Sequence, residues 1–354
     1  MTMAAPPGSS EPATSPPTGP AAASAGPARP ARDPRQPVRF ASYNLLDLFE
    51  SDSAQERERY RLVREVIAGL DADVLAVQEI RASQPEPAIA RLRRLAGDVG
   101  MECVVPADGD GPGRTALATG GRGYHCGLLW RPGVAAVPGS FRESPVGRLW
   151  HGAGWLMLDF GGVLVRHGTF HAAPFVRQLR ADQNEMLIAL IGSGPDRAVP
   201  LLMGADWNTE SADLVADDET GEQKLYEPAD PFAGVPWFDG LIHQCEWSYD
   251  LRGRRKHRAD RHPGDVLFAG GLLDAAALLR APWQPTCGHY PGDGYGSRGI
   301  LRRIDAIRVQ RRVAPALRAY HVTDTELARQ ASDHLPVSVD YVPAGIEPEG
   351  AGDG

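Results

Sequence analysis

The sequence predicts a protein of the mixed α/β class. Short apolar runs typical of buried strands alternate with longer segments of helical periodicity, and several of the runs stop abruptly at a polar residue. The clearest example is 199–208, which reads Val-Pro-Leu-Leu-Met-Gly-Ala-Asp-Trp-Asn. A buried strand with polar side chains at its carboxyl end is typical of the places where α/β proteins bind ligands and perform chemistry.

The expected strands and helices follow one another along the chain. They are strands at 38–44, 73–78, 103–106, 125–130, 155–159, 163–171, 199–208, 304–309, 317–322 and 335–341, and helices at 53–70, 83–95 and 174–191. A capping box of Ser53 and Glu56 marks the start of the first helix. The glycines of 108–123 fit no phosphate-binding spacing, so this segment is expected to be a flexible loop.

Composition separates a folded body from its ends. Residues 1–37 are mostly Ala, Pro, Ser and Gly, and 343–354 are similarly poor in large apolar residues, so both are expected to be disordered tails. The whole chain is 42% hydrophobic and has a formal net charge of −8. This balance excludes a nucleic-acid binder that acts by bulk charge, and phosphate chemistry then needs a metal ion or a local basic patch.

The four cysteines, Cys103, Cys126, Cys245 and Cys287, have no paired spacing. They predict free or buried thiols in a reducing compartment, and neither a disulfide framework nor a zinc site. The sequence contains no recognisable signal peptide and no apolar run long enough to cross a bilayer, so a cytoplasmic location without a membrane span is expected. No feature of the sequence indicates a protein partner.

The expected strands deliver polar side chains at their ends. These residues are Asn44, Glu79, His171, Asp206, Asn208, Asp305, Asp333 and His334. Asp206 and Asn208 are two residues apart, so on an extended backbone both side chains leave the same face. Each residue taken alone also has an ordinary explanation, because single histidines often lie in the core and strand-end acids often cap the next helix.

Taken in order, these residues resemble the motifs of the endonuclease/exonuclease/phosphatase family, the deoxyribonuclease I-like phosphoesterases. The matching pieces are Ser-Tyr-Asn44-Leu, Val-Gln-Glu79-Ile, Thr-Phe-His171-Ala-Ala-Pro, Gly-Ala-Asp206-Trp-Asn208, Arg-Ile-Asp305-Ala-Ile and Ser-Asp333-His334-Leu-Pro-Val. The resemblance implies an α+β fold, an α/β sandwich in which two packed mixed β-sheets are flanked by helices. It also implies one catalytic domain at 38–342.

The chain departs from the family pattern at a few positions. Ala205 and Trp207 stand where the family usually has Gly and Phe, and neither change removes a ligand. His171 follows Phe170 where the family often has Thr, and His167, four residues earlier, is a rival for the same role.

The resemblance implies a site for Mg²⁺ or Mn²⁺. Glu79 is the expected ligand, with a carbonyl oxygen from Asn44 and a further carboxylate from Asp333. Oxygen ligands of this kind suit hard divalent cations better than they suit zinc.

The remaining residues are expected to act on water and phosphate. Asp206 would hold and activate the attacking water, and Asn208 would orient the water or the phosphate. His334 would donate to a phosphoryl oxygen or transfer a proton, with Asp305 fixing its tautomer. His171 would be a second donor on the opposite side of the phosphate, and the sequence leaves open which residue is base and which is acid.

Residues 217–299 form a long insert that is expected to be rich in loops and regular only at 265–279. The insert mixes aromatic residues with the basic residues Arg254, Arg255 and Lys256. If these residues form one wall of the cleft, they suit a nucleic acid or nucleotide. The alternative is a solvated loop whose aromatic side chains pack on the core.

The sequence therefore predicts a metal-dependent phosphodiesterase of nuclease type acting on a phosphoester substrate. The alternatives are a phosphomonoesterase, or an enzyme for lipid or sugar phosphates, that uses the same site. A protein that keeps the fold and only binds is a third hypothesis, which the complete set of polar residues disfavours.

Overall fold

The computed structural model describes residues 32–290 and 299–349. Most of the expected amino-terminal tail, part of the insert and the last five residues lie outside the described residues. Among the described helices, none combines the length and the apolar character that a bilayer span requires.

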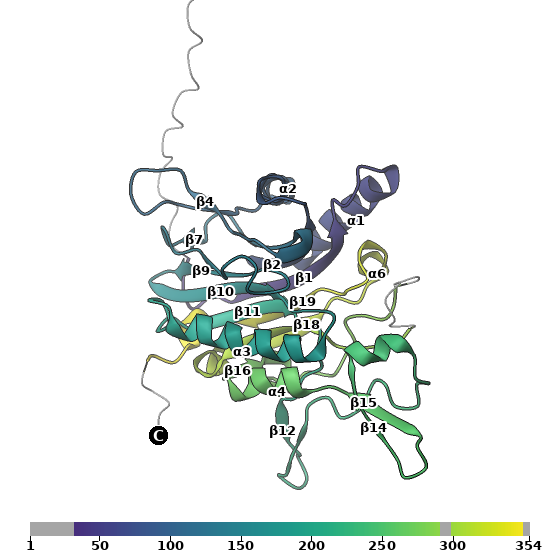
Figure 1. Ribbon diagram of the computed structural model, residues 1–354. Coiled ribbons are helices and arrows are strands. Elements are labelled where there is room, and N and C mark those ends of the chain that lie inside the picture. Colours follow the sequence, from purple (N-terminus) through teal and green to yellow (C-terminus); the bar gives the residue numbers. More distant parts are fainter. Residues whose placement is uncertain (1–31, 291–298, 350–354) are drawn as a thin grey trace, which may run out of the picture. The chain divides into compact units, whose positions relative to one another are not determined.

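Two β-sheets form the centre of the fold (Figure 1). The first contains, in spatial order, β18 (Leu317–Val322), β19 (Val337–Tyr341), β1 (Val38–Leu48), β2 (Val74–Arg81), β6 (Tyr124–Trp130) and β5 (Leu117–Ala118). The second contains β16 (Leu272–Asp274), β17 (Asp305–Gln310), β11 (Leu201–Asp206), β10 (Val163–His171), β9 (Ala153–Phe160) and β7 (Ala135–Ala136), with β8 (Arg142–Glu143) also on β9.

Both sheets are mixed. The pairs β1–β2 and β10–β11 are parallel, and the other neighbours in the two sheets are antiparallel. Because parallel strands end at the same edge, this topology collects the carboxyl ends of β1, β2, β10 and β11. The α+β sandwich expected from the sequence is confirmed.

Six helices accompany the sheets. They are α1 (Ala54–Leu70), α2 (Pro85–Asp98), α3 (Arg177–Ser193), α4 (His262–Ala269), α5 (Ala275–Leu278) and α6 (Glu326–Ala331) among the described residues. Ser53 caps α1 as predicted, with its hydroxyl accepting from the Glu56 amide at 3.1 Å. The capping box is only half formed, because the Glu56 carboxylate accepts from the Phe49 amide at 2.8 Å instead of turning back to Ser53.

Alternation along the strands builds three layers of core. Phe40 and Leu128 of the first sheet share a fully buried cluster with Leu202 of the second, so the sheets pack face to face. On the outer face of the first sheet, α1 and α2 pack with β1 and β2. On the outer face of the second, Leu187 of α3 and Leu267 of α4 pack with β10 and β11. Figure 1 shows the helices on both outer sides.

The ordered body extends beyond the boundaries expected from the sequence. Arg32, inside the expected tail, forms an ion pair with Asp73 at 2.5 Å, and the amide of Ala344 donates to the carbonyl of Pro34 at 3.0 Å. A short 3₁₀ helix, Pro343–Gly345, follows β19. These backbone and charge contacts order the described parts of both expected tails, although the segments bury little apolar surface.

The insert also contains more regular structure than the sequence suggests. It includes the two-stranded pair β12 (Leu214–Ala216) and β13 (Gln223–Leu225), which starts just before it, and the pair β14 (Cys245–Tyr249) and β15 (Arg255–Ala259). A third small pair, β3 (Val104–Val105) and β4 (Arg114–Thr115), lies in the loop before β5. The four cysteines are buried and free, as expected.

Candidate active site

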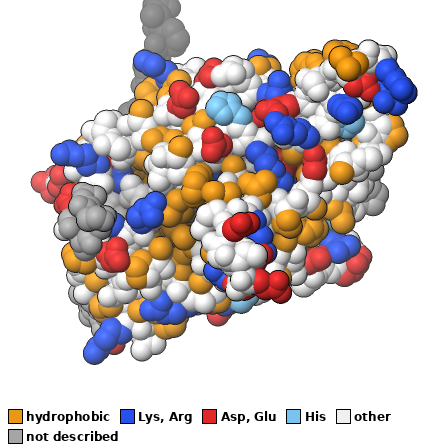
Figure 2. Space-filling model, turned by 90° about the horizontal axis from the view of Figure 1, so that it is seen from below, with side chains coloured by type: hydrophobic (Ala, Val, Ile, Leu, Met, Phe, Trp, Pro, Cys, Tyr) orange, Lys and Arg blue, Asp and Glu red, His pale blue; other side chains and the backbone are white. Residues whose placement is uncertain are grey.

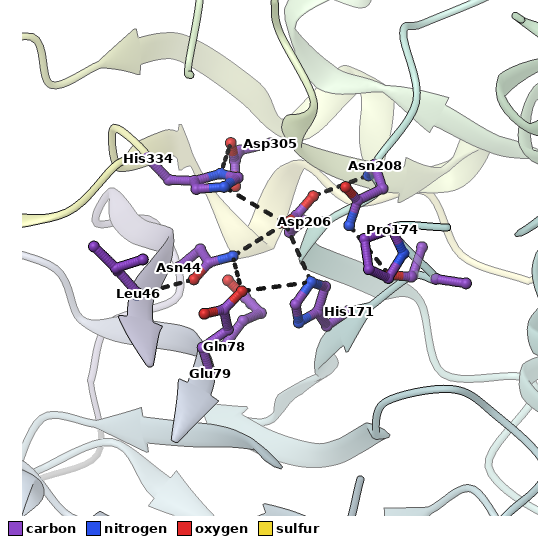
Figure 3. Close-up of polar contacts among 12 residues, drawn as sticks. Asn44, Leu46, Gln78, Glu79, His171, Pro174, Asp206, Asn208, Asp305 and His334 are labelled. Carbon is purple, nitrogen blue, oxygen red and sulfur yellow. Dashed lines mark hydrogen bonds and ion pairs between the residues drawn. The ribbon is translucent and has the colours of Figure 1, made fainter. Parts of the chain in front are cut away.

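The sheet edges bring the strand-end residues together (Figure 3). His171 and Asp206 are partners across the parallel pair β10–β11, and Asp206 and Asp305 are partners across the antiparallel pair β11–β17. His334 lies three residues before β19, which pairs antiparallel with β1. Residues far apart in the sequence therefore meet at one end of the sandwich. For example, the Ser332 hydroxyl donates to the backbone carbonyl of Asn44 at 2.8 Å, although the two residues are 288 positions apart.

The backbone that carries several of these side chains is irregular and directs them into the site. The pairing of β1 with β2 shifts register between Asn44 and Leu48, so the strands bulge where they reach the site. Positive φ angles occur at the non-glycine residues Leu46, Asp47, Glu79, Arg122 and Asn208. All five line the same cavity. Such conformations cost of order 1–3 kcal/mol each and concentrate at functional sites, so their clustering supports a functional cavity here.

Asp206 is the centre of the polar cluster. Its Oδ2 accepts from the Asn44 side-chain amide at 3.0 Å and lies 3.3 Å from Nε2 of His171. Its Oδ1 accepts from the backbone amide of Asn208 at 2.9 Å, and Nε2 of His334 is 3.8 Å from Oδ2. Burial acts to raise the pKa of Asp206, but the charges of His334 and His171 outweigh it and lower the pKa overall. Asp206 is therefore ionised at neutral pH.

His334 is held in one orientation by Asp305. Its Nδ1 and the Asp305 Oδ2 are 2.7 Å apart, and the backbone amide of Asp305 donates to the Thr286 hydroxyl at 3.1 Å. Burial lowers the pKa of His334, but the carboxylates of Asp305, Asp333 and Asp206 raise it well above its usual value. With Nδ1 bound to a carboxylate, Nε2 is the ring nitrogen left to act in the site.

His171, and not its rival His167, belongs to the site. Burial lowers the pKa of His171, but Asp206 and Glu79 raise it overall. His167 lies between the sheets, where Nε2 is 3.0 Å from the hydroxyl of Tyr341 and burial lowers its pKa to about 3. The sequence could not distinguish His167 from His171, because residues four positions apart on a strand point to the same face of the sheet.

Glu79 provides a partly accessible carboxylate that lines the cavity. Its Oε1 accepts from the Asn44 side-chain amide at 3.1 Å and its Oε2 accepts from the backbone amide of Asp47 at 2.8 Å. The side-chain oxygen Oδ1 of Asn44 accepts from the Leu46 amide at 3.1 Å, so the nitrogen end of this side chain faces the carboxylates. Glu79, His171 and Asp206 place ligand atoms within 4.8 Å of one another.

This donor set fits a hard divalent cation. Glu79 and Asp333 line the cavity, and Asp47 adds a third carboxylate next to Glu79. Carboxylate oxygens at the mouth of a cavity are the ligands that Mg²⁺ and Mn²⁺ prefer. The family motif predicts an Asn44 oxygen as a further ligand, which requires its amide to turn from the orientation seen here.

A layer of buried polar residues supports the cluster from between the sheets. The side-chain amide of Gln78 donates to the hydroxyls of Ser42 at 3.2 Å and Thr169 at 3.1 Å. These bonds link β1 and β2 of the first sheet to β10 of the second, so they fix the spacing of the two sheets directly below the acids.

The cluster opens into a cavity of about 560 Å³. Six of the eight residues predicted for the site line it, namely Glu79, His171, Asp206, Asn208, Asp333 and His334. Asn44 and Asp305 stand behind them as hydrogen-bonding partners. The insert contributes Gln244, Cys287 and Tyr290 to the wall.

Of the three basic residues proposed for substrate binding, Arg255 and Lys256 lie on β15 and Arg254 immediately precedes it, and none of the three lines this cavity. Arg254 is 2.8 Å from Asp250, and the guanidinium of Arg255 lies over the ring of Trp237 at 4.2 Å. Lys256 lines a separate surface pocket beside Trp247. Figure 2 shows acidic and basic side chains interspersed among the described residues of the face seen from below.

Sequence reasoning missed two site residues, Asp47 and His151. Burial, together with the charge of Glu79, raises the pKa of Asp47. The His151 ring is buried with its centroid 3.9 Å from that of His171, and burial lowers its pKa well below the usual value. Asp47 lies in the bulged end of β1 and His151 in a loop, so strand periodicity carries no information about the direction of either side chain. The signal that could have indicated His151 was a histidine between glycines in a loop.

The sequence model of the Endonuclease/Exonuclease/phosphatase family matches residues 41–341. The chain belongs to this family. Members of the family hydrolyse phosphate esters and generally use divalent metal ions, so a phosphoester hydrolase is supported. No curated protein matches the sequence.

Solved structures support the fold of this family member. A family protein from Bacteroides thetaiotaomicron aligns with 16% identity and a TM-score of 0.52, over 86% of this chain and 97% of its own. A conserved protein of unknown function from Enterococcus faecalis aligns with 16% identity and a TM-score of 0.51, over 85% and 98%. D. rerio TDP2 complexed with a single-strand DNA product aligns with 14% identity and a TM-score of 0.51, over 86% and 98%. At these identities the likeness concerns the fold.

Proposed function

We propose that the chain is a metal-dependent phosphodiesterase of nuclease type. The observation that carries the proposal is the ionised Asp206, held between two histidines whose pKa values are raised, at the wall of a cavity that also exposes Glu79. Hydrolysis of a phosphodiester needs a positioned water, donors for the phosphoryl oxygens and a cation, and these residues supply or bind each of them.

The reaction adds water to phosphorus and breaks one ester bond, so that an alcohol and a phosphomonoester are formed. Asp206 is ionised and accepts a hydrogen bond from the attacking water, which orients the water toward phosphorus. Asn208, whose backbone amide already bonds Asp206, fixes this carboxylate in place. One water proton is transferred to Asp206, and one of the two histidines, His334 or His171, gives a proton to the leaving oxygen, so that the alcohol is formed.

The two histidines face the phosphate, and the neighbouring carboxylates raise the pKa of both, which favours their charged forms. His334, charged because of Asp305, donates from Nε2 to a phosphoryl oxygen, and His171 donates from the other side of Asp206. Glu79 and Asp333 would hold a divalent cation, which would supply further neutralisation of charge on the phosphoryl oxygens. For a polymeric substrate we include Arg254, Arg255 and Lys256, at the start of β15, as contacts outside the cavity.

The same site can serve a phosphomonoester or a lipid or sugar phosphate, which is the second candidate. The cavity volume of about 560 Å³ admits small organic phosphates as readily as the end of a nucleic acid. A diester leaves one negative charge at the phosphate and a monoester two, so the surrounding carboxylates favour the diester.

The test is hydrolysis by the full chain of bis(p-nitrophenyl) phosphate, p-nitrophenyl phosphate, and single- and double-stranded DNA, each with Mg²⁺, Mn²⁺ or EDTA. We expect cleavage of the diesters that depends on the metal and stops in EDTA. Faster cleavage of the monoester favours the second candidate. If none of these substrates is cleaved with either metal, the result contradicts the proposal of a phosphoesterase that acts on these substrates.

A further inference from the structure

One wall of the cavity is built from aromatic side chains that the proposed chemistry does not use. Tyr124, Trp150 and Phe175 line it together with the exposed Arg122. The rings of Trp150 and Phe175 meet edge to face at 6.3 Å. The guanidinium of Arg122 lies 4.1 Å from the centre of the Trp150 ring, so the wall carries a positive charge next to flat apolar surfaces.

We call Tyr124, Trp150 and Phe175 the aromatic wall. The ring of His151 lies between this wall and His171 of the candidate site. His151 follows Trp150 in the chain, and its ring lies 3.9 Å from that of His171 and 5.0 Å from that of Tyr124. His171 is in turn 3.3 Å from Asp206. A group esterified to a phosphate at Asp206 therefore extends directly along the wall.

The wall comes from three separate segments and is held by contacts outside the cavity. The guanidinium of Arg81 lies over the Tyr124 ring at 4.2 Å, and Phe175 packs against His243 of the insert at 5.1 Å. Arg122 forms no ion pair with any acid in the described part of the chain, and it has a left-handed backbone (φ +59°). Its charge is therefore available to the cavity and not consumed by a surface pair.

We propose that the aromatic wall is a subsite for a planar aromatic group carried by the phosphoester, with Trp150 as its main contact. Aromatic faces bind flat π-systems by stacking, and such contacts are tolerant of the identity of the ring. A nucleobase and a phenyl group share this chemistry. The inference rests on the proposed function for the position of the phosphate, and it adds the class of group next to the phosphate.

The test measures binding and not turnover, so that it is independent of the proposed activity. Methyl methylphosphonate, phenyl methylphosphonate and thymidine 5′-methylphosphonate carry the same single charge and differ only in the esterified group. We expect calorimetric titration of the full chain with Mg²⁺ to give Kd values about tenfold lower for the two aromatic esters than for the methyl ester. Tighter binding of the thymidine ester identifies a nucleobase site, and tighter binding of the phenyl ester an aryl site.

Two variants connect the preference to the wall. Trp150→Ala removes the ring, and Trp150→Leu keeps apolar volume in case the alanine variant melts early. Both are expected to reduce the aromatic preference to about twofold or less. Trp283→Ala is the matched control, since Trp283 is 42% exposed and outside the cavity lining. Equal Kd values in the wild type, or an unchanged preference in the folded Trp150 variants, overturn the inference. Absence of hydrolysis in the separate turnover assay contradicts only the proposed function.

Discussion

Two clusters of charged side chains that are buried in the described part of the chain differ in what balances the acids. In the candidate active site, Asp206 and Asp305 are balanced by two histidines, and the cluster opens into a cavity. The second, here called the arginine cluster, has arginines in that role. It consists of Asp213, Glu227, Asp274, Arg303 and Arg308.

The two clusters differ in the side chains that bind the acids and in how those side chains titrate. Arg303 binds Asp274 through two bonds of 2.7 and 2.9 Å and Glu227 at 3.1 Å, and Arg308 binds Asp213 at 2.8 Å. Arginine stays charged at all relevant pH values and its planar fork fixes neighbouring strands, whereas histidine exchanges protons near neutral pH. Buried charge alone therefore does not mark a catalytic site. The cluster that we propose as catalytic differs in having titratable partners that face a cavity.

The largest effect is expected from Arg303→Met. The substitution leaves the buried Asp274 and Glu227 without their main partner. Breaking a buried pair in this way typically costs about 3–5 kcal/mol of unfolding free energy. Urea denaturation of the variant and of the wild type measures the loss. A loss below about 1 kcal/mol contradicts a structural role for the arginine cluster.

Asp206→Asn and His334→Ala are expected to lower turnover by about 10²-fold or more while the fold is kept. The reason is that each substitution removes a group that faces the reacting water or phosphate and that is not needed to hold strands together. Asp274→Asn is the matched control, because it alters an acid that is equally buried but belongs to the arginine cluster. Its kcat per folded molecule is expected to stay within about threefold of the wild type.

These rates are measured together with melting curves on the same preparations. Near wild-type turnover in Asp206→Asn contradicts the assignment of the site. A large loss of turnover in folded Asp274→Asn removes the distinction between the two clusters.

Glu227 is the titratable member of the arginine cluster. Burial raises its pKa to about 7, against the opposing charge of Arg303. A glutamate in the unfolded chain has a pKa of about 4.3, so between these values the folded protein keeps a proton that the unfolded chain has lost. The stability contributed by this proton is complete below the lower pKa and is lost as the pH rises to about 7. We expect Glu227→Gln to flatten this decline, by roughly 2 kcal/mol between pH 5 and pH 8.

Urea denaturation at several pH values checks this expectation, with Glu222→Gln at the exposed position just before β13 as the control. Parallel pH profiles for Glu227→Gln and the wild type contradict it.

The smallest effect is expected at the amino-terminal end of the described chain. Arg32 forms a partly exposed ion pair with Asp73, which also accepts from the Arg39 amide at 2.9 Å and lies 3.7 Å from Arg131. Arg32→Ala is therefore expected to lower the unfolding free energy by at most about 1 kcal/mol. Arg35→Ala is the control, because its side chain is 81% exposed. A melting temperature lowered as much as by Arg303→Met contradicts this ranking.

Much of the fold and of the candidate site follows from the sequence because strands are periodic. The patterns of 38–44 and of the apolar run before Asp206 predict two strands, both of which are almost entirely buried, and a polar residue at the end of each run marks the sheet edge. Strand periodicity does not show that these strand ends meet, because that depends on the topology of the sheets. The topology is predicted from the order of the family motifs along the chain.

What could not be predicted depends on contacts between distant or irregular segments. His151 stacks on His171 from a loop, and Asp47 reaches the site through a bulge with positive φ. The hairpin of β14 and β15 escaped detection because Arg255–Ala259 has no apolar alternation and its strands pack little core. Its turn is held by Asp250, which accepts from the amides of Arg252 and Arg254.

The most direct measurement is anomalous diffraction from crystals of the full chain soaked in Mn²⁺, with Glu79→Gln crystals as the control. We expect one strong manganese peak in the cavity, about 2.0–2.2 Å from a carboxylate oxygen of Glu79, that is lost in the variant. A cavity without a peak at a Mn²⁺ concentration that supports full turnover contradicts the central claim that this cluster, and not the arginine cluster, is the hydrolytic centre.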